Sequence, residues 1–343
     1  MSFDNLKLEK GMYRQEGMNF TQVLESLDPS ENYRGTALEG TDAFQRQLKR
    51  FGIRAKGAGS SPVEKFFRTM DSAVLFPEYI ARTVRQGMEE NDILPSIVAT
   101  TTVIDSMDYR SVYSDAKDDD KQLRDLAEGT AIPETTIRTK DRMVSLHKRG
   151  RMLVASYEAI RFQKLDLFGV MLRQIGAHIQ RMQLADAINV IIYGDGNDND
   201  CEDFTVGRDP IFGTEGQLCY EQLVEFWSQF DPYTMNTIIC GNSTLTQMLK
   251  MPELQDAAAG LNFHGSGCIG TPLGAKIHRV SSMRDGMLIG MDNRYTLEQI
   301  SCGDVLVEYD KLIDRQLERA AITTISGFNK ICDGAAKALY AWL

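Results

Sequence analysis

Three aspartates that follow a long apolar stretch have the residue type and spacing best suited in this chain to bind a metal ion. Asp195, Asp198 and Asp200 end the segment LADAINVIIYGDGNDND, residues 184–200, and carboxylates are ligands that Ca²⁺ and Mg²⁺ prefer. An EF-hand loop starting at Asp195 would need glycine sixth and glutamate twelfth, where the chain has Asp200 and Val206. The pattern favours a helix end followed by an exposed loop, with a cytosolic metal-dependent α/β enzyme as the alternative.

Other motifs that could carry chemistry lack the context that they need. GSGCIG, residues 265–270, matches G-x-G-x-x-G, but no predicted strand precedes it, and Pro272 and Gly274 follow where a helix should begin. No nucleophile-elbow, zinc-protease or Walker motif occurs. The six cysteines form no C-x-x-C pair, and the four histidines lie far apart. We therefore assign no catalytic residue, cofactor or metal ligand, and predict that the protein is not an enzyme.

Two neighbouring segments carry charge runs of opposite sign, and we expect these residues to act between subunits. The cations, in RTKDRMVSLHKRGR, are Arg138, Lys140, Arg142, Lys148, Arg149 and Arg151. The acids that we predict to pair with them are Asp115, Asp118, Asp119 and Asp120. Two solvated charge runs that never meet are the alternative.

The cationic segment is predicted to be an extended hairpin. TTIRTKDRMVSLH can alternate as a strand, KRG can turn, and RMLVAS can return. Such a hairpin has too few apolar residues to fold alone. It needs a surface to lie on, and a neighbouring copy of the chain supplies the opposite charge.

A second group of cations could contact phosphate. FQRQLKRFGIRAK, residues 44–56, contains no acidic residue and is either a solvated helix face or a patch that touches DNA. The candidate DNA-facing residues are Arg46, Lys49, Arg50, Arg54 and Lys56.

A long helix over residues 165–193 must position these segments. Its apolar residues recur every three or four positions, which places them on one helix face: Leu165, Phe168, Leu172, Ile175, Ile179, Met182, Ala185, Ile188 and Ile192. At about 1.5 Å per residue the helix would be roughly 43 Å long, and we expect other elements to cover most of it. Gly194 is the residue type that ends a helix.

The elements around this helix alternate in type. Residues 1–62 contain short amphipathic pieces and the flexible sequence KGAGSSP, which predicts an extended arm. Residues 217–260 are predicted as helix, strand and helix. Strands follow, with a hairpin turn at Asp285–Gly286 and a short helical piece at the C-terminal end.

The bulk composition is that of an ordinary globular chain. Of 343 residues, 43% are hydrophobic and 25% are charged, and the net charge is −10. The acidic balance argues against strong nucleic-acid or membrane binding. The N-terminal residues lack the apolar core of a secretory signal and no run of about 18 uncharged apolar residues occurs, so we expect a soluble chain made in a cytosol.

The order of these segments resembles the major capsid proteins of tailed bacteriophages, which share the Hong Kong 97 capsid fold. LAEGTAIPETTIRTKDRMVSLHKRGRMLVASYEAI is similar to the family's extended loop and its exit, FQKLDLFGVMLRQIGAHIQRMQLADAINVIIYGDG to its spine helix, IGTPLGAKIHRVSS to the glycine-x-proline start of a strand in the axial domain, and AAITTISGFNKICDGAAKALYAWL to the last strand and terminal helix of the peripheral domain. The resemblance spans roughly residues 65–343, and no motif identifies partners for the covalent cross-link of some members.

The resemblance implies an α+β chain with a defined order of parts. These are an N-terminal arm (1–62), a first peripheral part (63–127), an extended loop (128–156), the spine helix with a second peripheral part (157–204), an axial domain (205–305), and peripheral return strands with a C-terminal segment (306–343).

The function that the resemblance implies is structural. We expect a subunit that self-assembles through hexamers and pentamers into an icosahedral shell around double-stranded DNA, which it contacts weakly and without sequence preference. Scaffolding, portal and possibly decoration proteins are the expected partners, with no membrane partner. The expected location is the virion capsid, after assembly in the host bacterial cytoplasm. An encapsulin-like nanocompartment shell is the alternative on the same fold.

Overall fold

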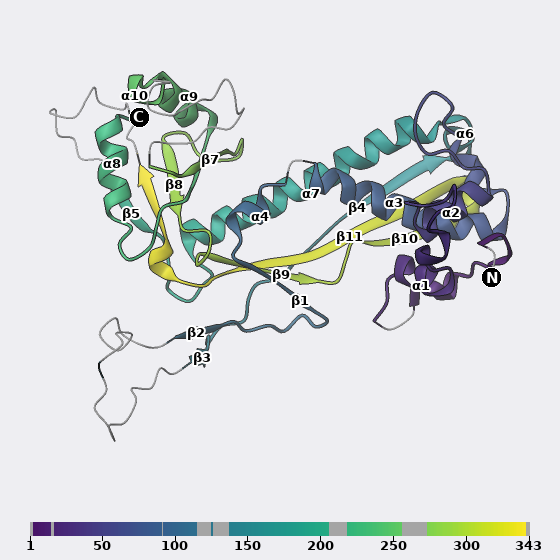
Figure 1. Ribbon diagram of the computed structural model, residues 1–343, viewed down its shortest axis with the longest axis horizontal. Coiled ribbons are helices and arrows are strands. Elements are labelled where there is room, and N and C mark those ends of the chain that lie inside the picture. Colours follow the sequence, from purple (N-terminus) through teal and green to yellow (C-terminus); the bar gives the residue numbers. More distant parts are fainter. Residues whose placement is uncertain are drawn as a thin grey trace. The chain divides into compact units, whose positions relative to one another are not determined.

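The computed structural model describes residues 3–14, 17–90, 92–114, 125, 137–205, 218–255 and 273–340 (Figure 1). The chain divides into two compact units. Unit 1 comprises Met1–Asp92, Lys148–Arg181 and Gly303–Thr324, and unit 2 comprises Ile93–His147, Met182–Cys302 and Ile325–Leu343. Each unit combines helices with strands, which confirms the predicted α+β class. None of the helices in the described ranges is long and apolar enough to cross a membrane.

The N-terminal segment is folded into the core of unit 1, so the predicted extended arm is wrong for its described residues. Helix α1 (Phe20–Leu27) and helix α2 (Ala43–Arg50) both begin with capping boxes, built on Asn19 and Asp42. Short 3-10 helices (Phe3–Asn5, Lys10–Arg14, Ser30–Tyr33 and Val63–Phe67) connect them. Leu24, Phe44 and Ile53 are buried in the same core as helix α3 (Met70–Glu89). Helices α1 and α2 thus have capped N-termini and an apolar face that packs within the chain itself.

Helix α7 (Leu165–Tyr193) confirms the predicted long helix, and Gly194, with φ of 73°, ends it as expected. The part of α7 up to Arg181 belongs to unit 1 and the rest to unit 2. In unit 1 it packs on helix α3 (Met70–Glu89) at unusually close range. A Cβ at Gly176 would lie 2.0 Å from the Val84 carbonyl oxygen of α3. Glycine lets the two backbones touch, as helix packing at such short distance requires.

The buried face of α7 differs from the predicted stripe in its second half. Leu165, Leu172, Ile179 and Ile188 are buried as predicted. Met182 is exposed, and the buried apolar positions after it are Leu184, Ala187, Ile188 and Ile191. Other elements also cover less of the helix than we predicted, since three apolar residues of its first half are exposed: Leu167, Val170 and Met171. The buried face changes because the two halves of the helix serve two different cores.

Unit 1 contains a sheet with strand β11 in its middle. Strand β10 (Leu306–Leu312) pairs antiparallel with the first part of β11 (Leu317–Lys330), with Leu306 opposite Thr323 and Leu312 opposite Leu317. Strand β4 (His147–Ser156) also pairs with β11. Because β10 occupies one edge of this part of β11, β4 lies along the other. Helix α6 (Tyr157–Phe162) follows β4 directly.

Gly150 does not form the predicted turn at KRG, because β4 runs straight through it. A Cβ at this position would lie 2.7 Å from Thr323 Cγ2 and 2.9 Å from the Ile322 carbonyl oxygen of β11. The glycine therefore serves a close approach between two strands. The predicted return strand after the turn is the second half of the same strand, so the hairpin pairing of 135–147 with 151–156 is wrong.

The larger sheet of unit 2 has the strand order β5-β12-β8-β6-β7. Its strands are β5 (Glu202–Thr205), β6 (Thr237–Cys240), β7 (Lys276–Arg279), β8 (Met287–Met291) and β12 (Ala336–Tyr340). Helices α8 (Tyr220–Ser228), α9 (Asn242–Lys250) and α10 (Pro252–Gln255) belong to the same unit. Strand β6 pairs with both β7 and β8, so Asp285–Gly286 does not close a hairpin between them.

The predicted helical piece at the C-terminal end is also wrong over its described residues. Ala336–Tyr340 is strand β12, which pairs parallel with β5 and antiparallel with β8. Its alanines and Leu339 are fully buried. Small and apolar side chains suit a helix by propensity, but a strand enclosed between two neighbours overrides that preference.

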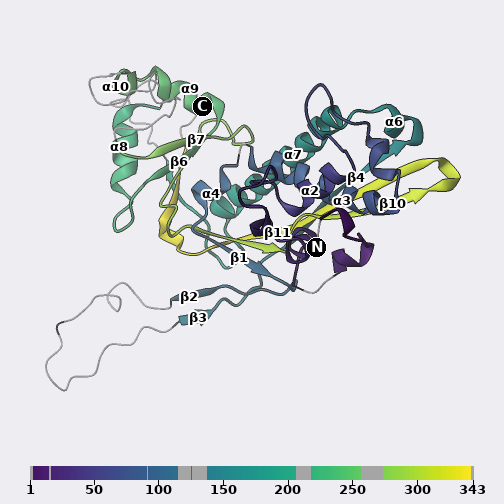
Figure 2. The same cartoon turned by 45° about the vertical axis from the view of Figure 1, so that its right-hand side comes forward.

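The remaining strands of unit 2 include a two-stranded ribbon. After the short helix α4 (Leu94–Ile97), strand β1 (Thr100–Ile104) pairs parallel with β9 (Leu297–Cys302), which in turn pairs with the end of β11. Strands β2 (Val112–Ser114) and β3 (Ile137–Thr139) pair antiparallel and run side by side in both views (Figure 2). A short two-stranded ribbon therefore exists, and its described strands are β2 and β3.

Candidate functional site

The β2–β3 ribbon exposes apolar side chains that its own strands do not cover. Val112 is 56% exposed and Ile137 is 71% exposed. The register places Val112 opposite Thr139 and Ser114 opposite Ile137. Two strands alone are only marginally stable in water, so the described part of the ribbon depends on the residues at its base.

The strand that leads into the ribbon is anchored by a buried carboxylate. Glu298 of β9 accepts hydrogen bonds from the hydroxyls of Thr102 and Tyr109, each at 2.7 Å, and of Ser111 at 2.8 Å. Burial, together with the hydrogen bond to Glu298, raises the pKa of Tyr109. Three donors from one segment converge on one acceptor, and this fixes the chain just before β2.

The strand that leaves the ribbon is anchored by Lys140, the residue after β3. Its Nζ lies 2.8 Å from Asp195 Oδ2 and 3.2 Å from Asn329 Oδ1, and it also donates to the Lys330 carbonyl oxygen. The Lys140 side chain is only 8% exposed. The predicted intersubunit role of Lys140 is therefore wrong, because its cation is used inside its own subunit.

Asp195 is the counter-ion of this anchor. Burial by itself would raise the pKa of its carboxyl group, but hydrogen bonds from Lys140 and Asn197 and the charge of Lys140 outweigh burial. The pKa consequently lies below its ordinary value of 3.8. Its Oδ2 also accepts from the Lys330 backbone N–H at 3.2 Å. The aspartate that sequence spacing offered as a metal ligand is thus an ion-pair partner.

Three residues of this anchor were missed by the sequence analysis: Glu298, Asn329 and Lys330. Lys330 is completely buried, and its Nζ donates to the Asn199 carbonyl oxygen at 2.9 Å. The signal that could have found them is a polar residue inside an apolar strand, as in GFNKIC. A buried polar side chain needs a partner, so such positions mark internal networks.

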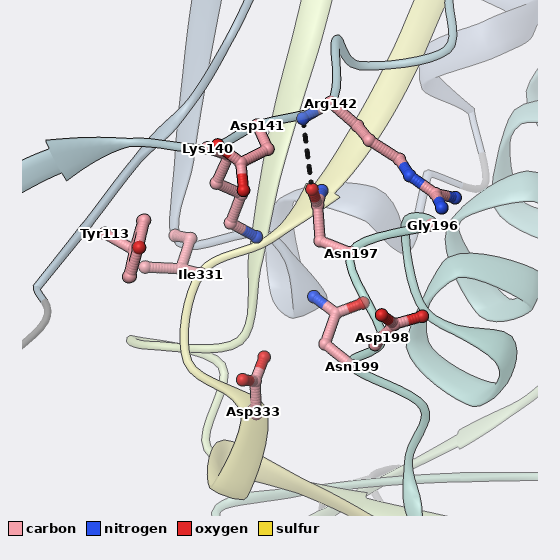
Figure 3. Close-up of a pocket in the computed structure, with 10 residues that line it drawn as sticks. All are labelled: Tyr113, Lys140, Asp141, Arg142, Gly196, Asn197, Asp198, Asn199, Ile331 and Asp333. Carbon is pink, nitrogen blue, oxygen red and sulfur yellow. Dashed lines mark hydrogen bonds between the residues drawn. The ribbon is translucent and has the colours of Figure 1, made fainter.

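A polar cavity of about 410 Å³ lies beside the anchor (Figure 3). Its described lining comes from Tyr113 of the ribbon, residues 140–142, the loop 196–199, Ile331 and Asp333. The Arg142 backbone N–H donates to Asn197 Oδ1 at 3.3 Å. These lining residues include no histidine, cysteine or serine, and among the residues that the structure describes no three histidine, cysteine or acidic side chains are grouped as metal ligands would be.

The other predicted cations lie in three places. Arg138 is exposed on β3, Arg142 is exposed at the base of the ribbon, and Lys148 and Arg151 are exposed on β4, where Arg149 is half-buried. The predicted acidic partners, Asp115, Asp118, Asp119 and Asp120, lie outside the described residues, as does GSGCIG.

Arg46 is wrong as a DNA-facing candidate, because its side chain is completely buried in unit 1. Its Nε donates to Asp28 at 2.7 Å, and its guanidinium also reaches the Asp28 and Thr41 carbonyl oxygens. Arg50 donates to the Leu6 carbonyl oxygen. The exposed members of the group are Lys49, Arg54 and Lys56. A capped amphipathic helix turns one side inward, and Arg46 lies on that side.

Neither a family model nor a curated protein matches the sequence. Among solved structures, the chain is similar to the virus-like particle from Pyrococcus furiosus, at 10% identity and a TM-score of 0.51, over 76% of this chain and 98% of that chain. It is also similar to the capsid of the native GTA particle, at 14% identity and a TM-score of 0.54, over 76% and 91% of the two chains.

A third similar structure is the capsid of the cyanophage P-SCSP1u, at 10% identity and a TM-score of 0.52, over 70% of this chain and 85% of that chain. The structures that this chain is similar to are thus shells and particles. The fold itself is the Hong Kong 97-type capsid fold, which the segment order implied.

Proposed function

We propose that this chain is the major capsid protein of a tailed bacteriophage, which assembles through hexamers and pentamers into an icosahedral shell around double-stranded DNA. The observation that carries the proposal is the β2–β3 ribbon, whose exposed apolar side chains stand on a firmly anchored base. A rigid base with an unsatisfied ribbon suits a subunit that completes its packing on a sister copy. The capsid fold supports the same conclusion.

The charge distribution is consistent with a container for DNA. Unit 1 holds 23 lysines and arginines against 21 acids, and unit 2 holds 15 against 27. A strongly cationic wall would hold phosphate tightly and hinder packaging and release. Weak contact through a few exposed cations, such as Lys49, Arg54 and Lys56, is the expected interaction with DNA.

The proposal includes the partners and location that such a shell requires. Scaffolding, portal and decoration proteins would act with the chain, which would be assembled in the host cytoplasm and reside in the virion capsid. The role is structural, with no catalytic step, cofactor or membrane partner. The division of residues 63–343 into peripheral and axial parts belongs to the same proposal, whereas the described residues of 1–62 fold into unit 1 and form no separate arm.

The experiment is expression of the full chain followed by sedimentation and negative-stain electron microscopy. Capsomers or closed shells are expected, and a stable monomer at high protein concentration would refute the proposal. Reversing Lys148 and Arg149 to glutamate should impair assembly more than folding, since each exposed ion pair contributes only about 0 to 1 kcal/mol but recurs at every contact of a shell. The matched control is Lys49→Glu with Arg54→Glu, and an unchanged shell yield in the β4 variant would contradict the intersubunit role.

An encapsulin-like shell around a protein cargo is the second candidate. The similarity to the virus-like particle from Pyrococcus furiosus is compatible with it, since the shared fold forms a particle there. The content of purified particles separates the two functions. Nuclease-protected double-stranded DNA supports the phage capsid, and a co-purifying enzyme inside DNA-free particles supports the nanocompartment.

A further inference from the structure

The sheet of unit 1 has two free edges among the described residues, and they differ in charge. Strands β4 and β10 each pair only with β11 over residues 148–156 and 306–312. An edge strand presents unpaired backbone N–H and C=O groups, which are a template for another strand. Lys148 and Arg151 are exposed on β4, whereas Glu308 and Asp310 are exposed on β10.

Both edge strands carry apolar side chains on each face of the sheet. Leu153 and Ala155 of β4 and Val307 and Tyr309 of β10 pack against the core of unit 1. Side chains alternate along a strand, so the residues between them point to the opposite face. These are Met152 and Val154 on β4, each 54% exposed, and Leu306, which is 56% exposed, on β10.

We propose that β10 of one copy pairs with β4 of the next, so that the sheet of unit 1 continues from subunit to subunit. This inference rests on the proposed shell function and assigns one of its contacts. If the β4 edges of two copies paired, Lys148 and Arg151 would face the same cations of the other copy. If the β10 edges of two copies paired, Glu308 would face the other copy's Glu308. Both like pairs are repelled, whereas β4 against β10 is attracted.

A contact of this kind is heterologous, because each copy uses two different surfaces. Repetition of a heterologous contact generates a ring when its rotation closes. Leu306 would then lie on the same face of the continued sheet as Met152 and Val154 of the neighbouring copy. Asp310 is bound to Arg319 of its own sheet at 2.7 Å, which leaves Glu308 as the main acidic group for the neighbour.

The test uses two complementary variants of the full chain. Glu308→Lys makes both edges basic, and Lys148→Glu with Arg151→Glu makes both edges acidic. Each variant alone should need roughly tenfold more protein for half-assembly by sedimentation velocity, since several weak pairs are reversed at each contact. In an equimolar mixture, the lysine edge of one variant meets the glutamate edge of the other, and the reverse contact is wild-type, so hexamers that alternate the two variants should form.

The outcomes separate this inference from the shell proposal. Recovery of assembly on mixing supports the β4–β10 contact, and a folding defect would not be rescued in this way. Glu89→Lys, an exposed reversal on α3, is the matched control and should assemble like the wild type. The inference is overturned if wild-type shells form but the mixture assembles no better than either variant, or if Glu308→Lys assembles normally. A wild-type chain that forms no capsomer at all would overturn both proposals.

Discussion

Replacing Lys140 by methionine should loosen the base of the β2–β3 ribbon by about 3 kcal/mol. The Lys140 and Asp195 side chains are 8% and 3% exposed, and their charged atoms lie 2.8 Å apart. Removing one partner of a buried ion pair costs about 3 to 5 kcal/mol, because the other charge is left uncompensated. The lower end of this energy range applies to Lys140→Met, because Asp195 keeps its hydrogen bonds from Asn197 and from the Lys330 backbone N–H.

Hydrogen exchange of the backbone amides at the ribbon base measures this loss. The Lys140 N–H donates to the Ser111 carbonyl oxygen at 2.8 Å and the Val144 N–H to that of Tyr109 at 2.9 Å, so both amides report opening of the base. A loss of about 3 kcal/mol corresponds to exchange that is more than a hundredfold faster. Arg142→Met, an exposed change in the same segment, is the control. Exchange in Lys140→Met within about threefold of the wild type would refute the anchor.

The same ion pair predicts a dependence on pH with a definite sign. The pKa of Asp195 is lower in the folded protein than its ordinary value of 3.8, so the unfolded chain binds its proton more readily. The stabilisation is therefore complete well above pH 3.8 and is lost as the pH falls through the folded pKa. In Lys140→Met the largest cause of the lowering is absent, and protection of the base should fail at higher pH than in the wild type.

Two further substitutions test the packing of unit 1. Gly176→Ala places a Cβ 2.0 Å from a carbonyl oxygen of α3 and should lower the free energy of unfolding by about 1 to 3 kcal/mol in denaturant titration, whereas Gly11→Ala, with no atom within 4 Å, should change it by less than about 0.5 kcal/mol. Arg46→Met removes the cation beside the buried Asp28 carboxylate, which keeps its hydrogen bond from the Tyr33 hydroxyl, and should cost about 3 to 5 kcal/mol. Arg46→Met should lower the free energy of unfolding far more than Lys49→Met does. Equal free energies of unfolding in the two variants would show that Arg46 is not buried.

The parts of the fold that were predicted correctly are those in which one local signal is repeated along the chain. The helix over 165–193 has a period of three to four apolar residues throughout, and Gly194 has the one residue type that adopts the helix-ending conformation without strain. The failures are residues with two possible uses. Gly150 and Asp285–Gly286 have turn chemistry, but the first serves a close strand contact and the second joins strands that do not pair.

The candidate site divides in the same way. From the sequence alone we predicted that the charged segment 135–156 has too few apolar residues to fold alone, because charge and hydrophobicity are properties of the residues themselves. Which of these cations is internal and which is external depends on how the chain folds. Lys140 and Arg46 have the same sequence signature as Arg142 and Lys49, yet the first two are buried against Asp195 and Asp28. The physical reason is that a charge pairs with the groups that are close to it in space. Elements that are far apart in the chain determine together which groups those are.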